Sequence, residues 1–393
     1  MKSILQNIKG DRVIWAIAVI LAIVSTLAIY SSISTLAYKS GGGNQEVILF
    51  KHLITVGVGF ALMFFVHKLK FNYYSKISQL AFYIALPLLA LTLVMGTNLN
   101  DASRWLVVPG LGISFQTSDL GKIALIAYLA RILAKRQDTI EDLKEGFFPI
   151  IWPIGLVCVL ILPANFSTAA VLFMVCFVLM FVGRVSLKYL GAMVGAGVFA
   201  FAILILLAYK APDVLPRLET WKNRIENFKN GENQENYQVN QAKIAIATGG
   251  IIGKGPGKST QRNFLPHPYS DFIYAFIIEE YGMIGGMGIV FLYMLLLYRV
   301  IIIVNKTDDT FGALLALGCG LLLVSQALIN MAVSVNLMPV TGQPLPFVSK
   351  GGTSVVFTGI ALGMILSVSK ELSQDHDPVK ESKKEKGGEL ATA

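Results

Sequence analysis

One carboxylate of this chain lies where a long polar segment meets an apolar run. Asp271 directly follows the polar stretch of residues 209–270, and an apolar run begins after it at Phe272. A charged side chain is costly to desolvate where a loop enters lipid, so it is retained there either in a strong pairing or for chemistry. We therefore take Asp271 as the candidate general base, a group that removes a proton from a reacting hydroxyl.

Asp119 and Lys122 form a second charged pair, at the start of another apolar run. They are three residues apart, so on a helix they share one face and can form an ion pair. A purely structural pair is one interpretation. Lys122, however, lies about one turn into the apolar run, where an ionisable group is by default a candidate for function.

Residues 249–261 form a glycine-rich turn region. Its Gly257-Lys258-Ser259 matches the end of a nucleotide-binding P-loop, but the first glycine of that motif falls on Ile252 and no strand precedes it. We therefore exclude a P-loop. The segment instead predicts backbone N–H groups and nearby cations that can hold a phosphate-bearing group. An ordinary solvated loop is the alternative.

Residues 330–354 contain three prolines and three glycines within an otherwise apolar stretch. This composition is too rigid and too apolar for a mobile linker. It predicts a re-entrant segment that lines a cavity, which a membrane protein tolerates where protein or water satisfies the backbone.

These segments together predict a cationic, partly apolar cleft with one carboxylate. Such a cleft suits a lipid-linked substrate that carries a diphosphate, because a base can activate an acceptor hydroxyl while cations stabilise the leaving diphosphate. The predicted catalytic residue is Asp271, and no metal ligands are assigned. The predicted substrate-binding residues are Arg104, Gln116, Lys122, Lys254, Lys258, Gln261, Arg262, Ser349, Gly351 and Gly352.

The composition indicates what must position these residues. Of the 393 residues, 54% are hydrophobic and 15% are charged, and the mean hydropathy is +0.64. These values favour an all-α polytopic membrane protein over a soluble protein of two domains. Cys158, Cys176 and Cys319 lie in apolar runs without paired or metal-ligand spacing, so we interpret them as small buried hydrophobic residues.

Ten apolar runs are long enough to cross the hydrocarbon of a bilayer. They lie near residues 13–36, 46–66, 77–95, 117–134, 148–162, 166–183, 189–208, 272–298, 311–333 and 353–369. The first run is too long for a signal-peptide core, so it predicts a retained helix. Only Pro163-Ala164-Asn165 separates the fifth and sixth runs, and one long helix with a proline kink is the alternative there.

The distribution of basic residues predicts the orientation. With the N-terminus in the cytoplasm, the cytoplasmic loops hold most of the basic residues of short loops, as the positive-inside rule requires. These are Lys68, Lys70, Lys76, Arg131, Lys135, Arg136, Lys144, Arg184, Lys188, Arg299 and Lys306. Ten spans then place both termini in the cytoplasm, with a large extracytoplasmic loop, residues 209–270, between the seventh and eighth helices. We expect one transmembrane domain over residues 1–370 and a disordered basic tail over 371–393.

Several motifs resemble the SEDS family (shape, elongation, division and sporulation) of peptidoglycan glycosyltransferases. The likeness covers nearly all ten runs. Its most specific parts are Leu265-Pro266 with Ser270-Asp271-Phe272-Ile273-Tyr274-Ala275 and Glu279-Glu280-Tyr281-Gly282; Gly249-Gly250 with Gly253-Lys254-Gly255; and Pro339-Val340-Thr341-Gly342 with Pro344-Leu345-Pro346-Phe347-Val348-Ser349 and Gly351-Gly352.

This resemblance implies that Asp271 matches the family's essential aspartate and that the substrate is lipid II. It implies an inverting enzyme of the bacterial cytoplasmic membrane, closest to the division members and located at the septum. It further implies a class B penicillin-binding protein and other division proteins as partners, contact with membrane lipid and no nucleic acid. It allows a divalent cation, Mg²⁺ or Mn²⁺, at the diphosphate. A lipid II flippase and an elongation-type polymerase are the alternatives.

The chain departs from the family pattern near the predicted site. Residues 267–270, before Asp271, replace the usual Glu-Ala-His-Thr, so assistance from that glutamate or histidine is not expected. Asn165 stands where the family has a carboxylate and is assigned no acid–base role. Lys350 replaces a frequent tyrosine. For Glu279 and Glu280, about two turns into the eighth predicted helix, we expect structural pairing ahead of catalysis.

Overall fold

The computed structural model describes residues 9–39, 45–99, 102–107, 114–210, 234–261, 264 and 271–375. Half of the segment of residues 209–270 and the predicted tail beyond residue 375 lie outside these ranges. Arg262 and residues 265–270 also lie outside them, as does the side chain of Arg104.

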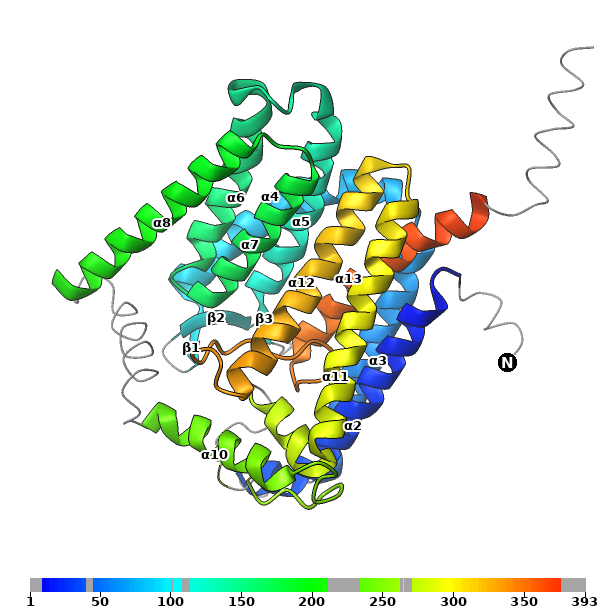
Figure 1. The fold of residues 1–393 in the computed structure, drawn as a ribbon, viewed down its shortest axis with the longest axis vertical. Coiled ribbons are helices and arrows are strands. Elements are labelled where there is room, and N and C mark those ends of the chain that lie inside the picture. Colours follow the sequence, from blue (N-terminus) through cyan, green and yellow to red (C-terminus); the bar gives the residue numbers. More distant parts are fainter. Residues whose placement is uncertain are drawn as a thin grey trace, which may run out of the picture.

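The described chain is almost entirely helical (Figure 1). Its α-helices are α2 (Arg12–Lys39), α3 (Gln45–Lys68), α4 (Phe71–Met95), α5 (Thr117–Lys135), α6 (Phe148–Ile161), α7 (Phe166–Val182), α8 (Leu187–Lys210), α10 (Gln234–Gly249), α11 (Ile273–Lys306), α12 (Thr310–Ser334) and α13 (Gly352–Asp375). A 3₁₀ turn (Gln137–Thr139) and a π-helical turn (Leu143–Phe147) connect α5 to α6.

Each of the ten predicted apolar runs lies on one of these helices. Seven helical segments meet the length and apolarity that a membrane span requires: α2, α3, α4, α6 together with the π-helical turn before it (Leu143–Ile161), α11, α12 and α13. Helices α7 and α8 contribute shorter apolar stretches, whereas α5 carries Asp119 and Lys122 near its start. The chain is therefore a multi-pass membrane protein, and the count of ten spans stays a prediction.

The structure excludes one alternative from the sequence analysis and adds one element that the sequence did not predict. Helices α6 and α7 are separate, because α6 ends at Ile161 and the side chain of Asn165 caps α7 by accepting a hydrogen bond from Thr168 N at 3.3 Å. One long kinked helix is thus wrong. A small antiparallel sheet, β1-β2-β3, also joins α4 to α5; its strands are Thr97–Leu99, Ala102–Val107 and Ser114–Gln116. These strands are too short for a clear periodic pattern in the sequence.

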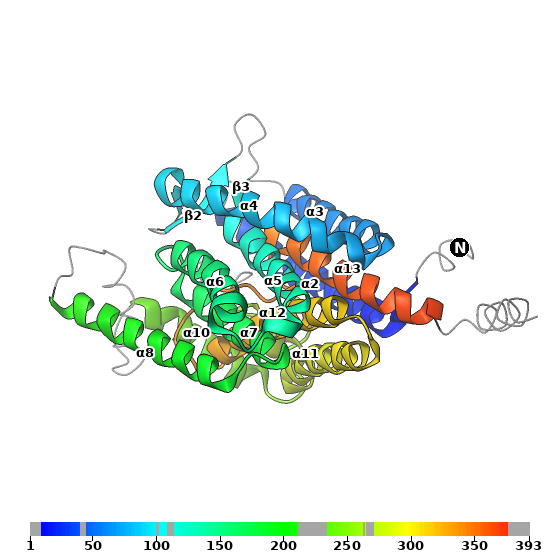
Figure 2. The ribbon, with the colours of Figure 1, turned by 90° about the horizontal axis from the view of Figure 1, so that it is seen from above.

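Helix α12 lies at the centre of the bundle, between α5 and α7 on one side and α11 and α13 on the other (Figure 2). Helices α3 and α13 approach most closely through small residues: a Cβ on Gly359 would collide with the carbonyl of Gly59. Such contacts between small residues are how helices pack when lipid supplies no hydrophobic driving force.

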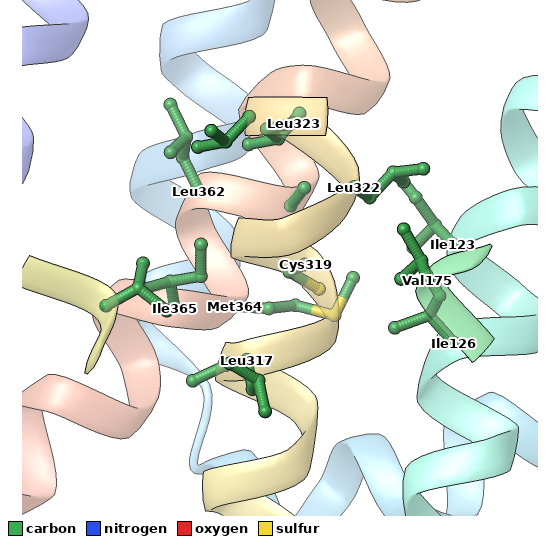
Figure 3. Close-up of a cluster of buried hydrophobic side chains, with 14 of the residues drawn as sticks. Ile123, Ile126, Val175, Leu317, Cys319, Leu322, Leu323, Leu362, Met364 and Ile365 are labelled. Atoms are coloured by element: carbon green, nitrogen blue, oxygen red, sulfur yellow. The ribbon is translucent and has the colours of Figure 1, made fainter. Parts of the chain in front are cut away.

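The strands, the start of α5, the start of α11 and the end of α12 lie together, and we call this the sheet end of the bundle. Further along these helices, away from the sheet end, ten buried side chains of α5, α7, α12 and α13 fill the centre of the bundle, and we call them the apolar layer (Figure 3). They are Ile123, Ile126, Val175, Leu317, Cys319, Leu322, Leu323, Leu362, Met364 and Ile365.

Candidate active site

Asp271 lies at the sheet end, two residues before helix α11, and is half-buried. Its backbone carbonyl accepts a hydrogen bond from Asn330 Nδ2 of α12 at 2.9 Å. The N-terminal end of a helix carries a partial positive charge, which stabilises a nearby carboxylate. The structure therefore holds this backbone in place while the side chain stays near the surface of the sheet end.

Lys122 is buried one turn into α5 and forms an ion pair with Asp119, with Nζ and Oδ1 2.8 Å apart. Its Nζ also donates to Gln326 Oε1 of α12 at 3.4 Å. The predicted pairing on one helix face is confirmed. The structure adds Gln326, which ties the cation to the central helix.

Residues 335–351, the proline loop, follow α12; most of residues 341–349 are buried, whereas Leu337 and Met338 are exposed. Four carbonyls of the loop accept hydrogen bonds from side chains of three helices. The donors are Asn330 to Gln343 O (2.7 Å), Gln326 to Pro344 O (2.9 Å), Tyr293 to Pro346 O and Ser25 to Val348 O (2.8 Å). The prediction that protein satisfies the backbone of this segment is confirmed for these carbonyls.

These bonds form one continuous polar network at the sheet end. Gln326 and Asn330 are one helical turn apart on α12, and they bind the adjacent carbonyls of Pro344 and Gln343. The network therefore runs from the Lys122 ion pair through α12 and the proline loop to the backbone of Asp271. Because most of its links are buried and hydrogen-bonded, it fixes the cation and the backbone of Asp271 in relation to each other.

Three atoms of this network are buried without a hydrogen-bond partner: Asp119 Oδ2, Asn330 Oδ1 and Gln343 Nε2. A buried polar atom without a partner costs about 1–3 kcal/mol, so native proteins contain few of them. These three atoms lie close to Asp271 and Lys122. The amino acids of this region are therefore not the ones that would give the most stable fold.

Other predicted residues lie around the same end. Gln116 N donates to Thr353 Oγ1 at 3.4 Å, which brings the end of β3 to the start of α13. Gly352 begins α13, and a Cβ built on it would meet open space. Ser349 Oγ instead accepts from Leu345 N at 2.8 Å inside the proline loop. Gln116, Ser349, Gly351 and Gly352 are thus near the network, while their contact with a substrate stays a prediction.

Lys350 adds a positive charge next to these residues. Burial, with a smaller contribution from the charge of Lys51, lowers the pKa of the Lys350 ammonium below its ordinary value.

The glycine-rich segment is placed differently from the prediction. The N–H groups of Gly253, Lys254 and Gly255 donate to the carbonyls of Gly249, Glu279 and Glu280, each at 2.9 Å. The prediction of a free row of N–H donors is therefore wrong for these three groups. They are used because this segment packs backbone to backbone against α11, which breaks at Gly282 with a φ of 70°.

Lys254 is paired within the protein in the same region. Its Nζ lies 2.7 Å from Oε1 of Glu279, a fully buried carboxylate that also accepts from Ser259 and from Thr260 N at 3.0 Å. The structural pairing predicted for Glu279 is confirmed. Lys258 is exposed, so it remains open to a substrate, and the binding roles of Lys254, Lys258 and Gln261 stay predictions.

A mostly apolar pocket lies beside the network, between α4, α5, α6 and the start of α7. It is lined by Leu89, Thr92, Leu93, Thr117, Ser118, Leu160, Ile161, Ala164 and Asn165. Thr117 and Ser118 directly precede Asp119. The partly apolar character predicted for the cleft is therefore present next to the ion pair.

The prediction missed Gln326, Asn330 and Gln343, although the sequence contains a signal for two of them. Gln326 and Asn330 are amide residues four positions apart in an apolar run, so they share one helix face. Polar side chains inside a span generally face the bundle interior and mark functional pathways. The four-residue spacing of Gln326 and Asn330 could therefore have identified them as candidate site residues.

The described side chains form no metal site of their own. Within the described ranges no group of three or more His, Cys, Asp or Glu side chains is placed to hold a metal ion. The buried carboxylate Asp119 instead contacts a lysine, whose charge disfavours a neighbouring divalent cation. We route no chemical step through a metal.

The chain matches known proteins over nearly its whole length. A family model described as "Cell cycle protein", covering FtsW, RodA and SpoVE, matches residues 11–374. A protein named probable peptidoglycan glycosyltransferase FtsW, from Geobacter sp. (strain M18), is 31% identical over 377 residues, 94% of this chain and 99% of the relative. Stage V sporulation protein E of Bacillus subtilis (strain 168) is 30% identical over 371 residues, 93% and 98% of the two chains.

Solved structures share the fold. A chain from work described as "Structural coordination of polymerization and crosslinking by a peptidoglycan synthase complex" matches with a TM-score of 0.74 at 24% identity, covering 93% of this chain and 99% of that one. The crystal structure of Thermus thermophilus rod shape determining protein RodA matches with a TM-score of 0.66 at 24% identity, covering 92% and 97%.

Proposed function

The chain belongs to the family of cell cycle proteins that comprises FtsW, RodA and SpoVE, and we propose that it is a peptidoglycan glycosyltransferase that polymerises lipid II into glycan strands. One observation carries the proposal beyond the relatives' names. A continuous, largely buried network links the backbone of Asp271 to the cation Lys122 at one end of the bundle.

Asp271 serves as the general base in this proposal. Its carboxylate takes the proton of the acceptor sugar hydroxyl while that oxygen attacks the anomeric carbon of the donor. The bond from this carbon to the diphosphate breaks, and its electrons leave with the diphosphate. An α-linked donor then gives a β-1,4 bond by a single inversion, so no covalent intermediate with the enzyme is needed.

Lys122 stabilises the charge that develops on the leaving diphosphate. A preorganised cation in a water-poor site acts strongly because no solvent has to reorganise during the reaction. Asp119 and Gln326 hold its ammonium in place at 2.8 and 3.4 Å. Arg104, Lys258 and Arg262 are the further cations that we propose for the diphosphate, together with Lys254 if it exchanges Glu279 for the substrate.

We further propose the membrane arrangement predicted from the sequence. Ten helices span the bilayer, both termini are cytoplasmic, and the loop of residues 209–270 faces outward with the sheet end. The enzyme then acts on the outer face of the cytoplasmic membrane, at the division septum. A divalent cation that accompanies the substrate diphosphate remains compatible with this arrangement.

The proposed partner is a class B penicillin-binding protein, which crosslinks the strands that this chain makes, within the larger set of division proteins. A structural relative comes from a peptidoglycan synthase complex, which supports a partner of this kind. The division role is favoured over elongation because several relatives carry the name FtsW.

A mutation of the base tests the proposal. Asp271→Asn keeps the size of the side chain and removes its basicity, so polymerisation should fall by about 10²- to 10⁴-fold. The measurement is glycan formation from labelled lipid II by the purified protein with its transpeptidase partner, whose crosslinking activity is blocked. Expression and thermal unfolding of the variant serve as controls. Glycan chains like those of the wild type from this variant would refute the assignment.

A further inference from the structure

Asn330 occupies the one point where α12, the proline loop and the start of α11 meet. It is 1% exposed, and its Nδ2 donates to two backbone carbonyls, Asp271 O at 2.9 Å and Gln343 O at 2.7 Å. The proline loop and the candidate base are thus joined through a single side-chain nitrogen.

These two bonds fix the orientation of the amide. A carbonyl oxygen cannot donate, so only the NH₂ group of Asn330 can face the carbonyls of Asp271 and Gln343. Oδ1 must therefore point elsewhere, and it is buried without a partner, as is Nε2 of the neighbouring Gln343. An apolar residue of the same shape would avoid that cost at Oδ1.

The side chain of Asn330 is surrounded by buried residues of its own helix. Asn330 packs within α12 between Ala327 and Ser334, which are both fully buried. Burying an amide there with one unpaired atom is unfavourable unless the two donated bonds are needed. Both of those bonds end on segments that carry the proposed chemistry.

We propose that Asn330 is a positioning residue that sets the place of Asp271 relative to Lys122. This inference rests on the proposed function and adds a residue to it. Asn330 holds the backbone of Asp271 against the proline loop, and one turn earlier Gln326 holds the same loop and Lys122. The distance between base and cation is thereby determined by a single turn of α12.

The mechanism is geometric. A base acts efficiently only within hydrogen-bond reach of the hydroxyl that it deprotonates. A displacement of about 1 Å at a reacting group can cost about 100-fold in rate. Loss of the Asn330 bonds lets the segment before α11 shift, and this lowers turnover more than it lowers substrate affinity.

Asn330→Leu, which has a similarly branched but larger side chain and no donor, provides the first test. We expect kcat for glycan formation to fall about 10- to 100-fold, with KM for lipid II changed by less than about threefold. Ser334→Ala is the matched control. It removes a buried bond to the carbonyl of Asn330 within the same helix, without touching Asp271 or the proline loop. It should retain the wild-type kcat.

Asn330→Asp provides a readout that a purely structural role would not change. Its ionised carboxylate cannot donate to either carbonyl, whereas protonation at lower pH restores one donor. The ratio of its kcat to that of Asn330→Leu should therefore rise as pH falls. Both variants contain Asp271, Asp119 and Lys122, so the titration of these neighbours cancels in the ratio.

Three results would overturn the proposal: an unchanged kcat in Asn330→Leu, an equal loss in Ser334→Ala, or a ratio that does not change with pH. If Asn330→Leu does not fold, the Asn330→Asp profile still decides, measured against wild type at each pH. Failure of this inference can be distinguished from failure of the proposed function. Wild-type activity in Asp271→Asn would refute the role of Asp271 as the base. An inactive Asp271→Asn together with a fully active Asn330→Leu would refute only the positioning role of Asn330.

Discussion

Helices α5 and α12 pass through two regions of opposite character. At the sheet end they contribute Lys122, Gln326 and Asn330 to a buried polar network. One to two turns away, the same helices contribute Ile126, Leu322 and other members of the apolar layer (Figure 3). Polar side chains between helices are expensive in a membrane, so a buried group of them beside Asp271 is a candidate for function.

The apolar layer also bears on what the protein can transport. A pathway for a charged headgroup across the bilayer needs polar side chains or water along its length. The described side chains of the layer beneath Lys122 and Gln326 are all apolar and buried. The comparison therefore favours catalysis at one face over passage through this part of the molecule.

Two carboxylates, Glu279 within α11 and Asp271 just before it, repeat the contrast on a smaller scale. Glu279 is fully buried and saturated by Lys254, Ser259 and Thr260, so its role is to join the glycine-rich segment to α11. Asp271 is half-buried, and the network holds its backbone carbonyl. Glu279 therefore stabilises the fold, whereas Asp271, at the edge of the polar network, is the carboxylate that we propose as the base.

The largest effect within the network is expected for Lys122→Met. Removal of the ammonium eliminates a cation from the proposed leaving-group site, so kcat/KM for lipid II should fall about 100-fold. It also leaves Asp119 buried and unpaired, which costs about 3–5 kcal/mol of stability. Steady-state polymerisation and thermal unfolding measure the two effects separately.

The double variant Asp119→Asn/Lys122→Met separates stability from activity. It removes both charges, so it should regain much of the lost stability while its polymerisation stays low. An unchanged dependence of rate on lipid II in Lys122→Met would take this residue out of the site.

A smaller effect is expected for Gln326→Leu. This change removes the bond to Pro344 O and one partner of Lys122 but leaves both proposed reacting groups in place, so kcat/KM should fall about tenfold. The matched control is Ser367→Ala. It removes a buried bond to a backbone carbonyl, Leu69 O, at the opposite end of the bundle. Equal losses of activity in the two variants would contradict the difference between the ends.

The smallest effect on activity is expected for Leu323→Ala in the apolar layer. It should lower the free energy of unfolding by about 2–5 kcal/mol through loss of packing. Polymerisation per folded molecule should stay within about twofold of wild type. A large loss of turnover in well-folded protein would show that the layer takes part in the reaction.

The sequence was sufficient to predict the helices and the charged groups, because both depend on local patterns. Apolar runs of about 20 residues mark spans, and the three-residue spacing of Asp119 and Lys122 places them on one face. The pairing of the two side chains followed directly. The start of α11 next to Asp271 followed from the change in polarity alone.

The links between segments could not be predicted in the same way. The bonds of Asn330 to Asp271 and Gln343 join residues up to 59 positions apart, which no local pattern encodes. The glycine-rich segment misled the prediction because its N–H groups meet the carbonyls exposed by the break at Gly282. The glycines of this segment allow close approach to another backbone. A glycine-rich sequence that serves this purpose looks the same as one that binds phosphate.

A vesicle assay that follows two products at once tests the central claim most directly. Purified wild-type protein with its crosslinking-blocked partner is reconstituted with labelled lipid II, and glycan chain length and transfer of lipid II between leaflets are measured in one sample. The account predicts glycan chains and no acceleration of transfer. Accelerated transfer without glycan chains would contradict it, because the polar network would then serve a transporter.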